Sequence, residues 1–97
     1  GTHAAHLLLG TGERIALGAT SARIGRLDDC AVMVTDVNVS RYHAEVRPAS
    51  DGHGYEVCDL GSTNGTLVNG LRIEGARPLT DGDLISVGNT HLRFEAR

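Results

Sequence analysis

Apolar and polar residues alternate in short runs along most of this 97-residue chain. A period of two is typical of strands with one buried face, and turn formers at intervals of about eight to twelve residues are typical of a sandwich or barrel. Helical periodicity is hard to find. The pattern therefore predicts an all-β fold. We expect strands at 5–9, 13–17, 22–25, 31–34, 42–47, 55–59, 66–68, 71–73, 84–88 and 90–95.

Some of the predicted turns carry a more specific signal. Asn69-Gly70 separates two strand-like runs, and both residues tolerate positive φ, so we expect a two-residue hairpin turn of type I′. Gly88-Asn89 indicates a second hairpin of this kind. Pro78 has no backbone N–H to donate in a central ladder, so we place it at a sheet edge or in a connection.

Size and composition limit the class of protein. Halves of about 50 residues would bury too little surface to fold alone, so we expect 1–97 to form one domain. The net charge of −3 and the small aromatic content of 3% argue against a nucleic-acid partner. The core is expected to consist of Leu, Val, Ile and Ala side chains. The opening Gly1-Thr2-His3 is set aside as a candidate cloning remnant.

The cysteine and charge patterns predict where the protein works. Cys30 and Cys58 form neither a C-x-x-C pair nor a dense framework, which favours a reduced, cytoplasmic setting. No apolar run reaches the ~18 residues of a membrane span, and no signal peptide is recognisable, so we expect no membrane insertion. All nine basic residues are arginine, which is consistent with a bacterial source of high GC content.

Three motifs could carry chemistry: "IGR" at 24–26, "SRYH" at 40–43 and "GSTNGT" at 61–66. Each is weak alone, but together they place guanidinium, hydroxyl and amide donors at strand ends and in loops, with almost no carboxylate among them. Such donors can bind a tetrahedral oxyanion. A phosphate monoester in particular forms charge-assisted hydrogen bonds with Arg and Ser side chains that converge on it. The candidate binding residues are Arg26, Ser40, Arg41, Thr63 and Asn64.

A catalytic interpretation of these residues is weaker. Ser40 and His43 could form a nucleophile and base, with Asp36 or Asp59 as a third member. However, residues three apart in an extended segment point to opposite faces, and no G-x-S-x-G elbow surrounds the serine. We therefore expect His43 to hydrogen-bond nearby backbone and to fix the loop that holds Ser40, and we expect no catalysis.

Metal binding finds little support in the sequence. The histidines and cysteines show neither H-x-x-x-H nor C-x-x-C spacing, and Asp81-Gly82-Asp83 lacks the other ligands of a calcium loop. We expect no metal and no other cofactor.

In combination, the motifs resemble those of the forkhead-associated (FHA) domain. The matching stretches are "IGR", "SRYHAEV" from Ser40, "DLGSTNGTLVNG" from Asp59 and "LTDGDLISVG" from Leu79. The resemblance covers about residues 6–95. It implies a β-sandwich of about eleven mostly antiparallel strands, whose loops at one end bind phosphothreonine in an extended peptide.

The resemblance also implies residue roles. Arg26 would pair with the phosphate, Ser40 would donate its hydroxyl to it, and Thr63 would contact it from the opposite loop. Asn64 would hold the main chain of the peptide, and Arg41 would add a second cation. Gly25, His43 and Gly65 would support the shape of the loops.

The implied partner is a threonine-phosphorylated protein or peptide, either a Ser/Thr kinase or one of its substrates. A structural β-sandwich that binds its partner without phosphate dependence is the alternative.

Overall fold

The computed structural model describes residues 5–96, which form eleven strands and no helix. The bounds are β1 (Ala5–Leu9), β2 (Arg14–Leu17), β3 (Ala22–Gly25), β4 (Val32–Met33), β5 (Ala44–Pro48), β6 (Tyr55–Asp59), β7 (Thr66–Val68), β8 (Leu71–Arg72), β9 (Arg77–Pro78), β10 (Leu84–Val87) and β11 (Thr90–Ala96). The prediction for residues 1–3 lies outside the described residues.

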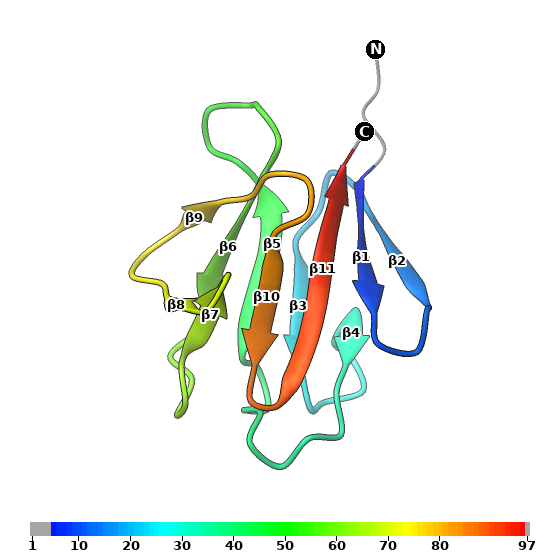
Figure 1. Ribbon diagram of the computed structural model, residues 1–97, viewed down its shortest axis with the longest axis vertical. Coiled ribbons are helices and arrows are strands. Elements are labelled where there is room, and N and C mark those ends of the chain that lie inside the picture. Colours follow the sequence, from blue (N-terminus) through cyan, green and yellow to red (C-terminus); the bar gives the residue numbers. More distant parts are fainter. Residues whose placement is uncertain (1–4, 97) are drawn as a thin grey trace.

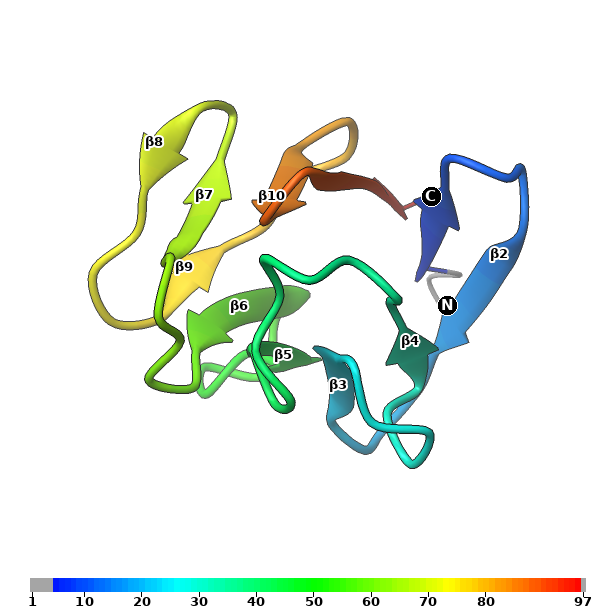
Figure 2. The same ribbon diagram turned by 90° about the horizontal axis from the view of Figure 1, so that it is seen from below.

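The strands form two sheets that pack face to face (Figures 1 and 2). One sheet has the order β2-β1-β11-β10-β7-β8, and the other has the order β4-β3-β5-β6-β9. The pairs are antiparallel except for β3 and β4, where Ile24 lies opposite Val32. The predicted all-β sandwich of about eleven mostly antiparallel strands is therefore confirmed.

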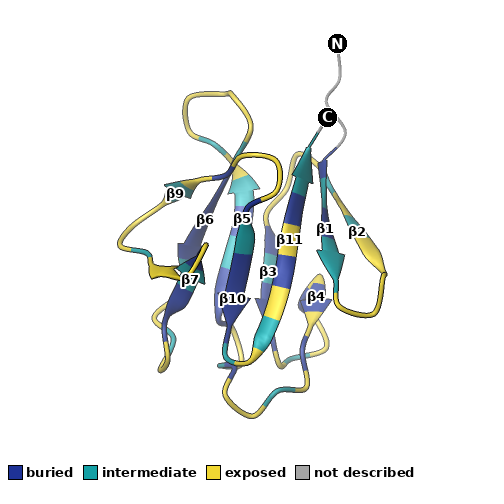
Figure 3. Cartoon of the chain, viewed as in Figure 1, coloured by how far each residue is buried: buried dark blue, intermediate teal, exposed yellow. Residues whose placement is uncertain are grey.

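Buried and exposed residues alternate along β11 (Figure 3), and the buried ones of both sheets form the core between them. In β11, Leu92 and Phe94 are buried, whereas His91 and Arg93 are exposed. Because successive side chains of a strand point to opposite faces, this alternation turns every second residue inward. The largest fully buried apolar side chains are Phe94, Leu7, Ile24, Ile85, Leu92, Val32, Val39, Val46, Val57, Val68 and Val87.

Several predicted strand bounds differ from the observed ones by one residue at an end, and two differences are larger. The strand expected at 42–47 begins only at Ala44, because the backbone at 41–42 bends so that His43 can reach the neighbouring loops. The short strand β9 was not predicted, since two residues are too few to show a period. Pro78 does lie at a sheet edge there, because β9 pairs only with β6.

The two predicted hairpins are present, and only one has the predicted turn type. Asn69 and Gly70 have φ values of 53° and 83°, and Val68 pairs with Leu71, as a type I′ turn requires. In the hairpin between β10 and β11, positive φ is confined to Gly88. That pattern fits a type II′ turn, so the expectation of a second type I′ turn was wrong.

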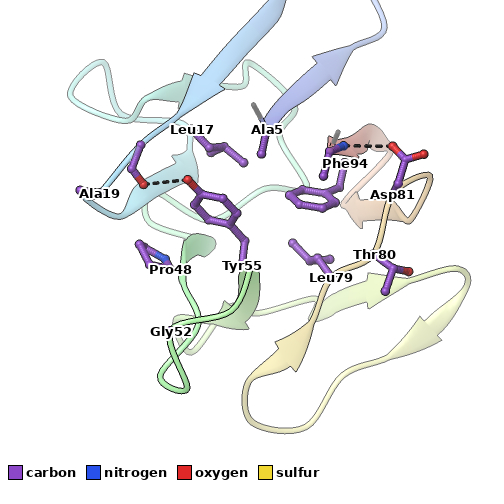
Figure 4. A pocket seen from close by; sticks show the side chains of 13 residues that line it. Ala5, Leu17, Ala19, Pro48, Gly52, Tyr55, Leu79, Thr80, Asp81 and Phe94 are labelled. Atoms are coloured by element: carbon purple, nitrogen blue, oxygen red, sulfur yellow. Dashed lines mark hydrogen bonds between the residues drawn. The ribbon is translucent and has the colours of Figure 1, made fainter. Parts of the chain in front are cut away.

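The two ends of the sandwich differ in character. At the end where Ala5 pairs with Ala96, a shallow hollow of about 740 Å³ opens between the sheets beside Tyr55 and Phe94 (Figure 4). The Tyr55 hydroxyl donates to the carbonyl of Gly18 and fixes the ring there. The loops that carry the three motifs lie at the opposite end (Figure 1).

Candidate functional site

Three loops meet at one end of the sandwich: the β3–β4 loop (26–31), the β4–β5 loop (34–43) and the β6–β7 loop (60–65). Figure 2 views the molecule from this end. The backbone N–H of Arg26 donates to the Ser40 carbonyl at 3.2 Å, which joins the first two loops. The Asn64 side-chain amide donates to the Asn38 carbonyl at 2.8 Å, which joins the second and third. The structure thus brings all three motifs together.

Arg26 follows directly after β3 and is exposed. Its Nε donates to the Val39 carbonyl at 2.6 Å, so the guanidinium is held against the β4–β5 loop. Within residues 5–96, its two terminal nitrogens have neither a hydrogen bond nor an ion pair. The side chain is therefore fixed at one atom and keeps the planar edge that binds an oxyanion.

Ser40 lies opposite Thr63 across the loops. The backbone N–H of Thr63 donates to Ser40 Oγ at 3.2 Å. A hydroxyl that accepts a hydrogen bond still has its own proton to donate. Ser40 is therefore oriented by the β6–β7 loop with its O–H free for a ligand.

A hollow of about 160 Å³ lies between these side chains. Residues with hydrogen-bond donor side chains and the apolar residues Val37 and Val39 line this hollow together. The full lining is Arg26, Val37, Asn38, Val39, Ser40, Thr63 and Asn64. Four of the five predicted binding residues line it. The fifth, Arg41, is exposed beside it and lines a separate hollow of about 470 Å³ with Leu27, Ser40, Tyr42 and Leu60.

His43 connects two of the loops from below. Its side chain is fully buried, its Nδ1 accepts the Ser40 N–H at 3.0 Å, and its Nε2 donates to the Gly65 carbonyl at 2.7 Å. The expected hydrogen bonds to backbone are present. Both ring nitrogens are occupied by backbone groups while the Ser40 hydroxyl faces Thr63, so the arrangement is not that of a nucleophile with its base.

The two glycines predicted to support the loops are both in close contact. A Cβ on Gly25 would lie 2.1 Å from the Arg41 carbonyl oxygen, so only glycine lets the first two loops approach this closely. Gly65 has a φ of 82°, and a Cβ there would lie 2.8 Å from Cζ of Arg72. At Gly25 a side chain is excluded because the clashing atoms belong to the fixed backbone. At Gly65 the flexible Arg72 side chain could move aside, and it is the positive φ that favours glycine.

Two carboxylates that the sequence analysis did not assign to the site hold its loops in place. Asp36 accepts the backbone N–H of Asn38 at 2.9 Å and that of Asn89 at 2.7 Å, which ties the β4–β5 loop to the β10–β11 hairpin. Hydrogen bonds from these two backbone N–H groups lower the pKa of Asp36. The signal in the sequence was an Asx pattern, Asp followed two residues later by a turn residue.

Asp59 does the same for the β6–β7 loop. It accepts hydrogen bonds from the Ser62 hydroxyl at 2.5 Å and the Thr66 hydroxyl at 2.7 Å, and from the backbone N–H groups of Ser62 at 2.8 Å and Gly61 at 3.0 Å. Burial raises the pKa of Asp59, but these hydrogen bonds outweigh it, so the pKa is lowered overall. Because this carboxylate is occupied within its own loop, it does not neutralise the donors of the hollow.

Two further features of residues 5–96 concern metal binding and membranes. That part of the chain has no group of three or more His, Cys, Asp or Glu side chains that could hold a metal ion. It also has no helix with the length and hydrophobicity needed to cross a membrane. Cys30 and Cys58 are buried free thiols, and burial raises the pKa of each.

Comparison with known proteins agrees with this geometry. A family model described as the FHA domain matches residues 22–88. An ABC transporter ATP-binding/permease protein of Mycobacterium tuberculosis is 42% identical over 84 residues, covering 87% of this chain and 9% of that protein. The oxoglutarate dehydrogenase inhibitor of Corynebacterium jeikeium is 41% identical over 83 residues, covering 86% of this chain and 56% of that protein. This chain therefore spans less than two thirds of either relative.

A solved structure points the same way. A chain from a structural and functional analysis of phosphothreonine-dependent FHA domain interactions is similar to this one with a TM-score of 0.85 and 36% identity, over 95% of both chains. The family model, the sequence relatives and the shared sandwich agree, and the chain belongs to the forkhead-associated (FHA) domain family.

Proposed function

We propose that this chain binds proteins phosphorylated on threonine and that the hollow between the three loops takes the phosphate. The observation that carries the proposal is the convergence of Arg26, Ser40 and Asn64 on one hollow. Among residues 5–96, nothing accepts a hydrogen bond from the terminal nitrogens of Arg26 or from the Ser40 hydroxyl. A study of phosphothreonine-dependent FHA domain interactions supplied one of the similar structures, which supports the same ligand.

Each residue has a proposed task. The terminal nitrogens of Arg26 pair with phosphate oxygens, and the Ser40 hydroxyl donates to a third oxygen. Thr63 contacts the phosphothreonine from the other loop, and Asn64 holds the main chain of the peptide. Arg41 contributes a positive charge from the rim.

The expected affinity follows from these contacts. Two or three charge-assisted hydrogen bonds contribute about 1.5–3 kcal/mol each, and the cost of ordering an extended peptide is subtracted from their sum. These contacts limit the affinity to about the micromolar range at the tightest, which suits reversible signalling. We infer that the chain has no catalytic activity, and that it acts in a Ser/Thr kinase pathway inside the cell. The predicted unit of function is the single domain 1–97.

Calorimetric titration tests the proposal with a peptide in three forms, carrying threonine, phosphothreonine or phosphoserine. We expect the phosphothreonine form to bind and the unmodified form not to bind. Equal binding of these two forms would refute the proposal and favour a phosphate-independent interaction domain. Weaker binding of the phosphoserine form would support a preference for threonine.

A variant shows whether binding occurs at the hollow. Arg26→Ala should abolish phosphopeptide binding and leave the melting temperature nearly unchanged, because the side chain is exposed. Arg93→Ala is the matched control, since Arg93 is also exposed but lies on β11. Full binding by Arg26→Ala would place the phosphate elsewhere.

A further inference from the structure

Beside the proposed phosphate site, Arg72 offers a second cationic group that no predicted role includes. We propose that the Arg72 guanidinium binds an acidic side chain in the bound phosphopeptide and so selects among phosphorylated partners. This inference rests on the proposed function and deepens it, because it names a feature of the partner's sequence.

The position of Arg72 follows from the strand register. Arg72 in β8 pairs with Leu67 in β7, whereas the neighbouring Thr66 and Val68 are buried. Arg72 therefore lies on the outer face of its sheet and is exposed.

From this outer face the Arg72 side chain extends over the β6–β7 loop. A Cβ on Gly65 would lie 2.8 Å from both Cζ and Nε of Arg72, so the guanidinium covers the residue next to Asn64. The backbone at Gly65 is held from its other side by the hydrogen bond from His43 to its carbonyl. The guanidinium thus rests on a fixed part of the site and not on a mobile loop tip.

No carboxylate among residues 5–96 forms an ion pair with Arg72. Among the arginines at 5–96, four form ion pairs with carboxylates, namely Arg14, Arg23, Arg47 and Arg77. Arg72 forms none there, even though Glu74 lines the same hollow beside β8. Arg26 and Arg41, at the proposed phosphate site, likewise lack an acidic partner within the described residues.

Each of the three loops thus has one of these arginines in it or against it, Arg26, Arg41 and Arg72 respectively, on a domain whose net charge is −3. Because surface charges are screened within about 10 Å at 0.1 M salt, the local charge at these loops is what a ligand meets. Arg93 has no carboxylate partner among residues 5–96 either, but its Nη1 donates to the Gly82 carbonyl away from the three loops.

The reach of an extended peptide connects the two sites. The Thr63 N–H contacts Ser40 Oγ, and Gly65 follows only two residues later. An extended chain advances about 3.3 Å per residue, so a peptide leaving the phosphate past Asn64 would meet Arg72 after roughly two to four residues. An Asp or Glu at that place would form a charge-assisted hydrogen bond with the guanidinium.

Phosphothreonine peptides with one glutamate moved through the positions on either side test the inference. Each is compared with the alanine-flanked parent by fluorescence anisotropy, using the wild type, Arg72→Gln and Arg93→Gln. We expect glutamate at one or more of these positions to tighten binding by about two- to fivefold, the range of an exposed ion pair. The gain should disappear in Arg72→Gln, persist in Arg93→Gln and shrink as salt is added.

A charge reversal guards against a structural effect of the variant. Arg72→Glu should prefer a lysine at the position where the wild type prefers glutamate, which loss of structure could not produce. If the alanine-flanked phosphopeptide binds but glutamate gives no gain, or gives the same gain in Arg72→Gln, the inference is wrong and the proposed function stands. If no phosphopeptide binds the wild type, both are wrong.

Discussion

Replacing His43 tests whether one buried side chain holds the two halves of the site together. His43→Phe keeps a ring of similar size in the core but removes both hydrogen bonds. The Ser40 N–H and the Gly65 carbonyl, now bonded at 3.0 and 2.7 Å, would lose their partner beside a fully buried side chain. An unsatisfied buried polar group costs about 1–3 kcal/mol, so the free energy of unfolding should fall by about 2–6 kcal/mol.

The assay is urea unfolding followed by circular dichroism, supported by thermal melting. For a domain of this size, 1 kcal/mol corresponds to roughly 4–8 °C, so the melting temperature should fall by at least about 8 °C. His53→Phe is the control, because His53 is exposed in a loop, and it should change little. His43→Gln should lose less than His43→Phe, because its amide can both accept and donate.

Phosphopeptide binding by the folded fraction gives a second measurement. With Ser40 and Gly65 no longer fixed, we expect the dissociation constant to rise by about tenfold, which corresponds to about 1.4 kcal/mol. A stability loss as small as that of His53→Phe would refute the argument from unsatisfied groups. A large stability loss with unchanged affinity would show that His43 serves folding alone.

Two further predictions concern the loops. Gly25→Ala should lower the free energy of unfolding by about 1–3 kcal/mol, because its Cβ would lie 2.1 Å from the Arg41 carbonyl oxygen, whereas Gly18→Ala meets nothing within 4 Å and should be neutral in the same thermal melts. The lowered pKa of Asp59 means that its stabilising effect is complete above the ordinary aspartate pKa of 3.8 and is lost as pH falls through the lower pKa of the folded state. Unfolding at a series of pH values should therefore show stability falling below about pH 4. Asp59→Asn should be less stable at neutral pH and flatter in acid, and an unchanged acid slope would contradict this account.

The donor residues that line the hollow could be predicted from the sequence, and so could the supporting residues Gly25, His43 and Gly65. The two supporting carboxylates could not. Arg26, Ser40 and Asn64 were recognisable because donor side chains without nearby carboxylates are unusual in turn-rich loops. Asp36 and Asp59 look like ordinary turn residues in the sequence. Their role depends on which backbone N–H groups face them, and Asn89 lies 53 residues from Asp36. No local pattern encodes such a contact.

Strand boundaries show the same division. The period of two predicted β1 with its observed bounds, Ala5–Leu9, because that strand is long enough to alternate. The same period placed the start of β5 two residues too early. Tyr42 and His43 continue the alternating pattern in the sequence, but the backbone there is not extended as a strand. The two residues of β9 had no period to show.

The sequence by itself determined the all-β class, the approximate strands, the Asn69-Gly70 turn and the donor residues of the site, because alternation, turn chemistry and functional groups are local properties. Only the tertiary structure decided that the three loops meet. It also showed that His43 joins Ser40 to Gly65, and that Arg72 returns from the sheet to cover the loop beside Asn64. Those facts arise from the packing of two sheets, which brings distant residues into contact, and such contacts are not written in the spacing of residues along one chain.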